Sequence, residues 1–164
     1  QKLALCCALI HKPKVLFLDE PTTGVDPVSR KEFWEMLKRL QREITIIVST
    51  PYMDEANLCD RIALMQNGNL LQIDTPASII NSFKNTLFAI RAENMHQLIN
   101  DVRSISGVNS CFGFGDYLHV TTESASLNDN YLNQQIAALG HTGIEIKIIS
   151  PEIEDCFMAL MEQV

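Results

Sequence analysis

Residues 15–27 read Val-Leu-Phe-Leu-Asp-Glu-Pro-Thr-Thr-Gly-Val-Asp-Pro, a short apolar run that ends abruptly in two adjacent acids, Asp19 and Glu20. Such a run, leading directly into acids, is typical of a fully buried strand in a parallel sheet. Open α/β sheets bind their ligands at the carboxyl ends of these strands. Two acids at a strand tip suit a magnesium nucleotide, because one can hold the metal while its neighbour takes a proton from water.

Two segments beside this strand predict more of the same sheet. Residues 2–10 are apolar nearly all round, which is typical of a buried helix. Residues 44–48 are all β-branched, which predicts a second strand. This strand also ends in polar residues, Ser49 and Thr50. The sequence therefore predicts two neighbouring strands that present polar side chains at their carboxyl ends.

Local signals predict how the connecting segments begin and turn. Asp26 is a suitable N-cap for the amphipathic helix that follows, and Pro27 occupies its first position. Asn67-Gly68 separates two apolar runs, which indicates a two-residue hairpin. We assign residues 1–83 to one α/β domain on these grounds.

Residues 84–164 alternate between strand and helix patterns and form a second predicted domain. The expected elements are strands at 87–92, 108–114, 117–122 and 144–149, and helices at 95–105 and around 132–139. The resulting order, βαββαβ, is the ferredoxin-like α+β arrangement. A last helix is expected after Pro151, continuing to Val164.

The distribution of charge along the chain indicates which kinds of binding partner are compatible with it. The formal net charge is −7; residues 1–83 carry nine Lys/Arg and ten Asp/Glu, whereas residues 84–164 carry four and ten. This acidity argues against nucleic acid as a partner, since phosphate neutralisation needs clustered basic residues. Surface acidity that serves only solubility is the alternative explanation.

Other bulk features concern compartment and completeness. No apolar run approaches the roughly 20 residues of a membrane span, and no signal peptide precedes the first motif. The five cysteines form no metal-ligand spacing, which favours free thiols in a reducing cytosol. Because the chain begins at Gln1 rather than Met, we expect the C-terminal portion of a longer protein.

Three motifs in order across residues 1–76 resemble those of the ATP-binding cassette (ABC) family of transporter ATPases. They are Leu-Asp-Glu-Pro-Thr-Thr-Gly-Val-Asp-Pro, the strand ending in Ser-Thr, and Tyr-Met-Asp-Glu-Ala followed by Cys-Asp-Arg-Ile. The resemblance implies a partial P-loop NTPase-type sheet that uses ATP and Mg²⁺. It also implies roles for three acids: Asp19 acts on magnesium through its water shell, Glu20 is the general base, and Asp26 belongs to the D-loop that meets the partner ATPase subunit.

The sequence departs from the family pattern in two places. It contains no Gly-x-x-x-x-Gly-Lys-[Ser/Thr] loop to cradle the phosphates, so this fragment alone is expected neither to bind ATP tightly nor to hydrolyse it. Pro51 also replaces the switch histidine that family members usually carry after the second strand, and proline has no side-chain donor and no backbone N–H. Two interpretations remain open: a degenerate site, or a slower ATPase in which Glu20 carries the chemistry.

The end of the chain refines the resemblance. Pro-Glu-Ile-Glu-Asp-Cys-Phe at 151–157 is similar to an ending common in ABC-2 type exporters. The resemblance thus implies an ATPase subunit that works as a homodimer or heterodimer with transmembrane permease subunits on the cytoplasmic face of the plasma membrane. The alternative is a degenerate, non-hydrolysing module for nucleotide-dependent assembly or regulation.

Overall fold

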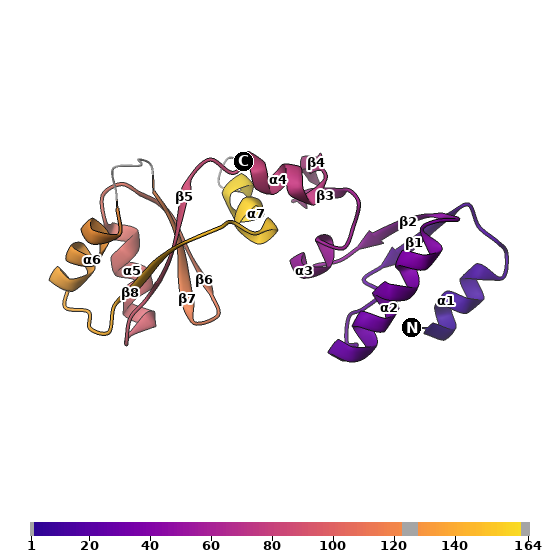
Figure 1. Cartoon of the computed structure of the whole chain (residues 1–164), viewed down its shortest axis with the longest axis horizontal. Helices are drawn as coiled ribbons and strands as arrows, with labels where there is room; N and C mark the ends of the chain where they lie inside the picture. Colours follow the sequence, from indigo (N-terminus) through magenta and orange to yellow (C-terminus); the bar gives the residue numbers. More distant parts are fainter. Residues whose placement is uncertain (1, 123–127, 162–164) are drawn as a thin grey trace. The chain divides into compact units, whose positions relative to one another are not determined.

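The computed structural model describes residues 2–122 and 128–161 of a mixed α/β protein (Figure 1). Its helices and strands form two compact units, Gln1–Asp60 and Arg61–Val164. The sequence-based boundary after residue 83 remains a prediction about which part can fold independently. None of the helices in the described ranges combines the length and the apolar character needed to cross a membrane.

The first unit is built on two parallel strands. Its elements are α1 (Lys2–Leu9), β1 (Val15–Asp19), α2 (Pro27–Leu40), β2 (Thr45–Ser49) and α3 (Met53–Ala56). β1 pairs with β2 in parallel, and the last residues of the two strands, Asp19 and Ser49, lie opposite each other. The predicted pair of strands with polar carboxyl ends is therefore present, and those ends meet at one edge of the sheet.

The core of this unit covers one face of the strands. Phe33, Trp34 and Leu37 of α2 pack in one cluster with Leu16 and Leu5. Because side chains alternate along a strand, the opposite face carries Phe17, which is 72% exposed. The expectation that this strand is fully buried is therefore wrong. The expectation of a buried first helix is also wrong, since Leu5 is its one buried residue in the described range.

The second unit begins with the predicted hairpin. β3 (Ile62–Gln66) and β4 (Asn69–Asp74) pair antiparallel, and the turn residues Asn67 and Gly68 have φ of 50° and 78°. Two consecutive left-handed residues are what a two-residue hairpin turn requires, and Asn-Gly tolerates that geometry best. α4 (Pro76–Ser82) follows, with Thr75 as its N-cap.

A four-stranded antiparallel sheet forms the remainder of the second unit. Its elements are β5 (Thr86–Arg91), α5 (Met95–Ser104), β6 (Val108–Phe114), β7 (Tyr117–Thr122), α6 (Asp129–Ala138) and β8 (Glu145–Ile149). The strands lie in the order β6-β7-β5-β8, with antiparallel pairing throughout. Residues from β5, α5 and α6, such as Phe88, Leu98 and Ile136, share one buried cluster. The two helices therefore pack on the same face of the sheet.

The last helix, α7 (Ile153–Met161), joins two parts of this unit. The Cys156 thiol lies 3.7 Å from the Ile79 carbonyl oxygen of α4, and Asp155 contacts His119 of β7. His119 alternates with the core residues Leu118 and Val120, so α7 lies against the sheet face opposite α5 and α6. The expected continuation to Val164 falls outside the described residues.

Candidate functional site

The two acids of the first motif lie at the tip of β1, beside the end of β2. The Ser49 hydroxyl donates a hydrogen bond to Asp19 Oδ1. The same hydroxyl oxygen accepts a hydrogen bond from the backbone N–H of Glu20 at 3.2 Å. The same N–H donates to the Ser49 carbonyl at 3.0 Å. Both acids are exposed. Pairing with β2 thus fixes the backbone at this point and leaves both carboxylates exposed to solvent.

Glu20 occupies an unusual backbone conformation. Its φ of 42° lies in the left-handed region, which residues other than glycine seldom adopt. Hydrogen bonds hold this turn: the Thr23 N–H donates to the Glu20 carbonyl at 3.2 Å, and the Thr23 hydroxyl donates to Glu20 Oε2 at 3.0 Å. Local strain that neighbouring bonds over-determine is typical of functional sites.

Asp26 forms the N-cap of α2, as the sequence predicts. Its Oδ1 accepts hydrogen bonds from the backbone N–H groups of Val28 at 3.1 Å and Ser29 at 3.0 Å. The hydrogen bonds from Ser29, chiefly from its backbone N–H, lower the pKa of Asp26 below its ordinary value. A D-loop role for Asp26 remains a prediction, and capping does not conflict with it.

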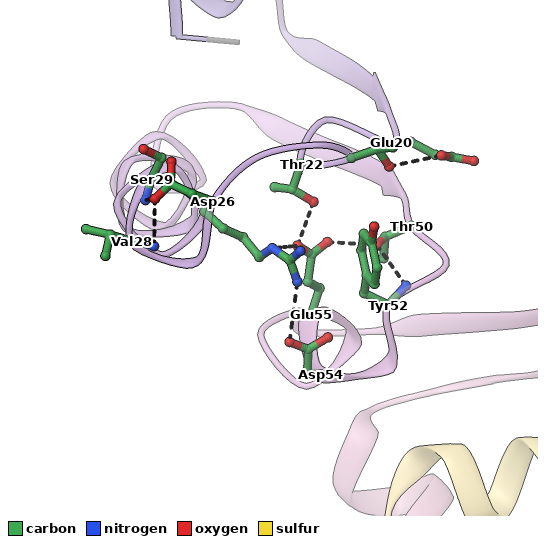
Figure 2. Close-up of polar contacts among 11 residues, drawn as sticks. Glu20, Thr22, Asp26, Val28, Ser29, Thr50, Tyr52, Asp54 and Glu55 are labelled. Carbon is green, nitrogen blue, oxygen red and sulfur yellow. Dashed lines mark hydrogen bonds and ion pairs between the residues drawn. The ribbon is translucent and has the colours of Figure 1, made fainter. Parts of the chain in front are cut away.

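A buried acid, Glu55, occupies the centre of the polar contacts in Figure 2, and the sequence analysis gives it no role. Its side chain is 1% exposed and accepts hydrogen bonds from the Thr22 hydroxyl at 2.6 Å and the Thr50 hydroxyl at 2.7 Å. Sequence separation hides this cluster, because Thr22 and Glu55 lie 33 residues apart. The available signal is that Thr22, Thr50 and Glu55 each lie within one of the three motifs.

Arg30 of α2 brings positive charge to this cluster. Its Nε lies 3.6 Å from Glu55 Oε1, and one terminal nitrogen lies 3.9 Å from the Asp54 carboxylate. The guanidinium also stacks over the Tyr52 ring at 4.4 Å from the centroid. Arg30 Nε is buried and makes no hydrogen bond within the described part of the chain.

Pro51 lies between β2 and α3, directly after Thr50, and is exposed. Since β1 and β2 run parallel, this position lies beyond the strand end that carries Ser49, next to the tip that carries Asp19. The ring offers no donor here. The neighbouring Tyr52 N–H is occupied, because it donates to the Thr50 hydroxyl at 3.1 Å.

The donor set at the strand tip can be tested against a magnesium ion. No group of three or more His, Cys, Asp or Glu side chains is placed to hold a metal among residues 2–122 and 128–161. The tip offers one Asp19 carboxylate with an adjoining Ser49 hydroxyl. This oxygen set fits Mg²⁺, which takes one or two carboxylates and fills its other positions with water and substrate phosphates.

Two histidines of the second unit, His119 and His141, lie within hydrogen-bond distance of acids far away in the sequence. His119 Nδ1 lies 2.7 Å from Asp155 Oδ1, and His141 Nε2 lies 2.8 Å from Asp101 Oδ2. The Phe114 ring stacks on His119 with centroids 4.2 Å apart. The first pair joins β7 to α7, and the second joins the loop after α6 to α5.

No family model matches the chain. It is 51% identical over 77 residues to the probable multidrug ABC transporter ATP-binding protein YbhF of Escherichia coli, which covers 46% of this chain and 13% of that protein. It is 38% identical over 116 residues to the human retinal-specific phospholipid-transporting ATPase ABCA4, which covers 70% of this chain and 5% of that protein. It is 44% identical over 80 residues to ABC transporter A family member 8 of Arabidopsis thaliana, which covers 48% of this chain and 9% of that protein.

Proposed function

The homologues of this chain are ABC transporter ATP-binding proteins, and on that premise we propose that it is part of an ATPase that couples MgATP hydrolysis to transport. One observation carries the proposal most directly: Asp19 and Glu20 lie together at the carboxyl end of β1, supported by Ser49 of the parallel neighbour. This is the edge at which α/β sheets bind ligands. The chain spans 13% or less of these relatives' lengths, so the activity belongs to a longer assembly.

The two acids divide the work at the strand tip. Asp19 would hold Mg²⁺ through its water shell, and the bound metal would neutralise charge on the phosphates. Glu20 would polarise the attacking water and accept its proton. The hydroxyl of Thr23, 3.0 Å from Glu20 Oε2, fixes one carboxylate oxygen and leaves the other to reach the water.

Replacement of Glu20 by glutamine tests this assignment. In the full-length protein that carries this chain, Glu20→Gln should retain ATP binding and lower turnover by roughly 10²-fold or more, because a positioned base contributes at least that much. Glu35→Gln is the matched control, since Glu35 is exposed on α2, away from the strand tip. Turnover in Glu20→Gln equal to that of the parent would remove Glu20 from the mechanism.

The remaining parts of the site lie outside this sequence. The phosphate-binding loop is absent from residues 1–164, so this chain by itself should neither bind ATP tightly nor hydrolyse it. We place Asp26 in the D-loop, facing a second ATPase subunit in a homodimer or heterodimer. We propose that the ATPase lies at the cytoplasmic face of the plasma membrane and that transmembrane permease subunits complete the transporter.

Export is the proposed direction of transport. The ending at 151–157 resembles that of ABC-2 type exporters, and Asp155 within it has a structural use here. It accepts a hydrogen bond from the Glu152 N–H at 2.8 Å at the start of α7, and it pairs with His119. The degenerate, non-hydrolysing alternative depends on Pro51 alone and is not favoured, because the acid pair is intact.

We also propose that residues 84–164 form a ferredoxin-like domain that mediates dimerisation or regulation. The strand order β6-β7-β5-β8 and the uniformly antiparallel pairing support this arrangement. A βαββαβ chain places its third strand between the first two in this way. The domain boundary after residue 83 and the partial P-loop NTPase-type sheet before it are parts of the same proposal.

A further inference from the structure

Glu55 is buried in a way that acidic side chains seldom are. It lies in the four-residue helix α3 and is 1% exposed, although its neighbour Asp54 has a side chain that is 74% exposed. A carboxylate is buried at such a position only when other groups compensate for its lost hydration. The groups that do so come from three different segments.

The two hydroxyl contacts have a fixed direction. The Thr22 hydroxyl donates to Oε1 and the Thr50 hydroxyl donates to Oε2, so both carboxyl oxygens act as acceptors. The Thr50 oxygen then accepts from the Tyr52 N–H at 3.1 Å. One carboxylate therefore orders both the loop after β1 and the segment after β2, and Figure 2 shows it between the two threonines.

Positive charge explains why a carboxylate rather than an amide suits this position. Arg30 lies beside Oε1 at 3.6 Å and is held in place by stacking on Tyr52. Arg30 belongs to the first turn of α2, directly after the Asp26 cap. Glu55 thus meets the loop after β1, the end of β2 and the start of α2 at one point.

The loop attached to Thr22 is short and internally bonded. The Thr23 N–H donates to the Glu20 carbonyl, and the Val25 N–H donates to the Thr22 carbonyl at 3.0 Å. Movement of Thr22 therefore moves the backbone of Glu20 and of the segment that leads to Asp26. On the other side, Thr50 directly precedes Pro51.

We propose that Glu55 is a positioning residue that holds the Glu20–Asp26 loop in register with the Thr50–Pro51 segment. Its catalytic consequence rests on the proposed function, because it assumes that Glu20 is the base. The structural role of Glu55, in holding the two segments together, does not depend on the proposed function. Glu55 acts through Thr22 and Thr50 and touches no substrate.

Hydrogen exchange of the nucleotide-free, full-length protein tests the structural content without any ATPase activity. Glu55→Gln has one acceptor oxygen and one NH2 group, so at least one of the two threonine hydroxyls loses its charged acceptor. Peptides covering residues 20–26 and 50–53 should therefore exchange about tenfold faster, as expected for loss of a hydrogen bond to a charged group. Peptides covering residues 33–40 of α2 should be unchanged. The control Asp60→Asn removes one exposed charge from the same segment and should leave all of these peptides unchanged.

A second pair of variants keeps the test decisive if Glu55→Gln does not fold. Thr22→Val removes the hydroxyl with little change of shape and should reproduce the faster exchange, whereas Thr22→Ser keeps the donor and should restore protection. Unchanged exchange in Thr22→Val, or uniformly faster exchange that includes residues 33–40, would overturn the proposal.

Turnover measurements then separate this proposal from the proposed function. Glu55→Gln should lower kcat by about tenfold with KM for ATP nearly unchanged, because positioning of the base is lost while nucleotide contacts stay. If Glu20→Gln has full activity, the assignment of Glu20 as the base in the proposed function fails, and the exchange result still decides the role of Glu55. If Glu20→Gln is inactive but the 20–26 and 50–53 peptides are unaffected by Glu55→Gln, the positioning role is the part that is wrong.

Discussion

The two units of the molecule differ in how much apolar surface they bury and in which polar groups they bury. In Gln1–Asp60 the apolar core is confined to one face of a two-stranded sheet, and Phe17 and Ile47 remain 72% and 48% exposed. In Arg61–Val164 a four-stranded sheet carries helices on both faces, and Phe88, Ile90 and Val120 are 0–1% exposed. The first unit has the smaller core, yet it contains the buried acid with the most partners, Glu55.

This difference indicates which unit supplies most of the chain's stability and which unit contains its candidate chemistry. Apolar burial supplies most of the driving force for folding, and the second unit has more of it. Its polar pairs, such as His119–Asp155, join elements that each contribute buried apolar side chains of their own, such as Val120 of β7 and Ile153 of α7. In the first unit the polar contacts of Thr22, Thr50 and Glu55 themselves determine where loops lie. The comparison thus separates a stable scaffold from a site that depends on polar order.

The largest expected effect concerns independent folding. Residues 84–164, expressed alone, should melt cooperatively, because they retain the whole cluster around Phe88 and Leu98. Residues 1–83 should show no cooperative transition, since a two-stranded sheet with one covered face is marginal in water. Thermal melting by circular dichroism checks both outcomes, and sedimentation of 84–164 over a range of concentrations checks the proposed dimer.

A longer segment serves as the control for this comparison. Residues 61–164 keep α4, whose Ile79 is fully buried and contacts Cys156 of α7, so they should melt at a higher temperature than 84–164. A monomeric but cooperative 84–164 would keep the domain and remove the dimerisation role. Aggregation of 84–164 beside a cooperative 1–83 would reverse the comparison.

Cysteine reactivity sharpens the comparison on a smaller scale. Burial raises the pKa of Cys111 and of Cys156 to about 11, whereas Cys6 and Cys7 are exposed. At pH 8 the two buried thiols should react with iodoacetamide about 10²-fold more slowly than a thiol with the ordinary pKa of 9.0, because the reactive thiolate is correspondingly scarce. Mass spectrometry of each peptide over time measures the rates. Equal rates in 8 M urea are the control, and equal rates in the folded chain would contradict a closed core.

The same thiols give the second unit a pH dependence with a definite sign. Their pKa in the folded state, about 11, lies above the reference value of 9.0. The unfolded chain therefore loses these protons first, so the stability they contribute is intact below about pH 9 and declines as the pH rises toward 11. Replacement of both cysteines by alanine should remove this part of the decline.

Features encoded by adjacent residues are predicted well from the sequence. The bounds of β6 and β7 agree with the predicted 108–114 and 117–122, because Gly107 marks the start of β6 and the Gly115-Asp116 turn separates the two strands. The hairpin turn and the Asp26 cap also follow from local chemistry, namely left-handed tolerance at Asn-Gly and a short acceptor before a helix.

Features that depend on distant segments are not predicted. The exposure of Phe17 depends on which layers cover the sheet, and apolar composition alone carries no information on that. The role of Glu55 depends on hydroxyls 33 and five residues away, brought together by parallel pairing of β1 with β2. For the site, the sequence therefore predicts Asp19 and Glu20 at the tip but not the buried acid that orders their loop.

The smallest expected effect concerns Pro51, at the exposed edge of the first unit. An imidazole can donate a hydrogen bond to a phosphate oxygen and proline cannot, so Pro51→His in the full-length protein should raise turnover by roughly tenfold or less, the lower range for a bond to a charged group. Steady-state ATP hydrolysis measures it. Pro51→Ala is the control, since it removes the ring without adding a donor and should leave turnover near the parent value. A gain in both variants would assign the effect to backbone freedom before α3. No gain in Pro51→His would show that hydrolysis does not depend on this position. Glu20, held through Thr22 and Glu55, would then carry the chemistry without a switch residue.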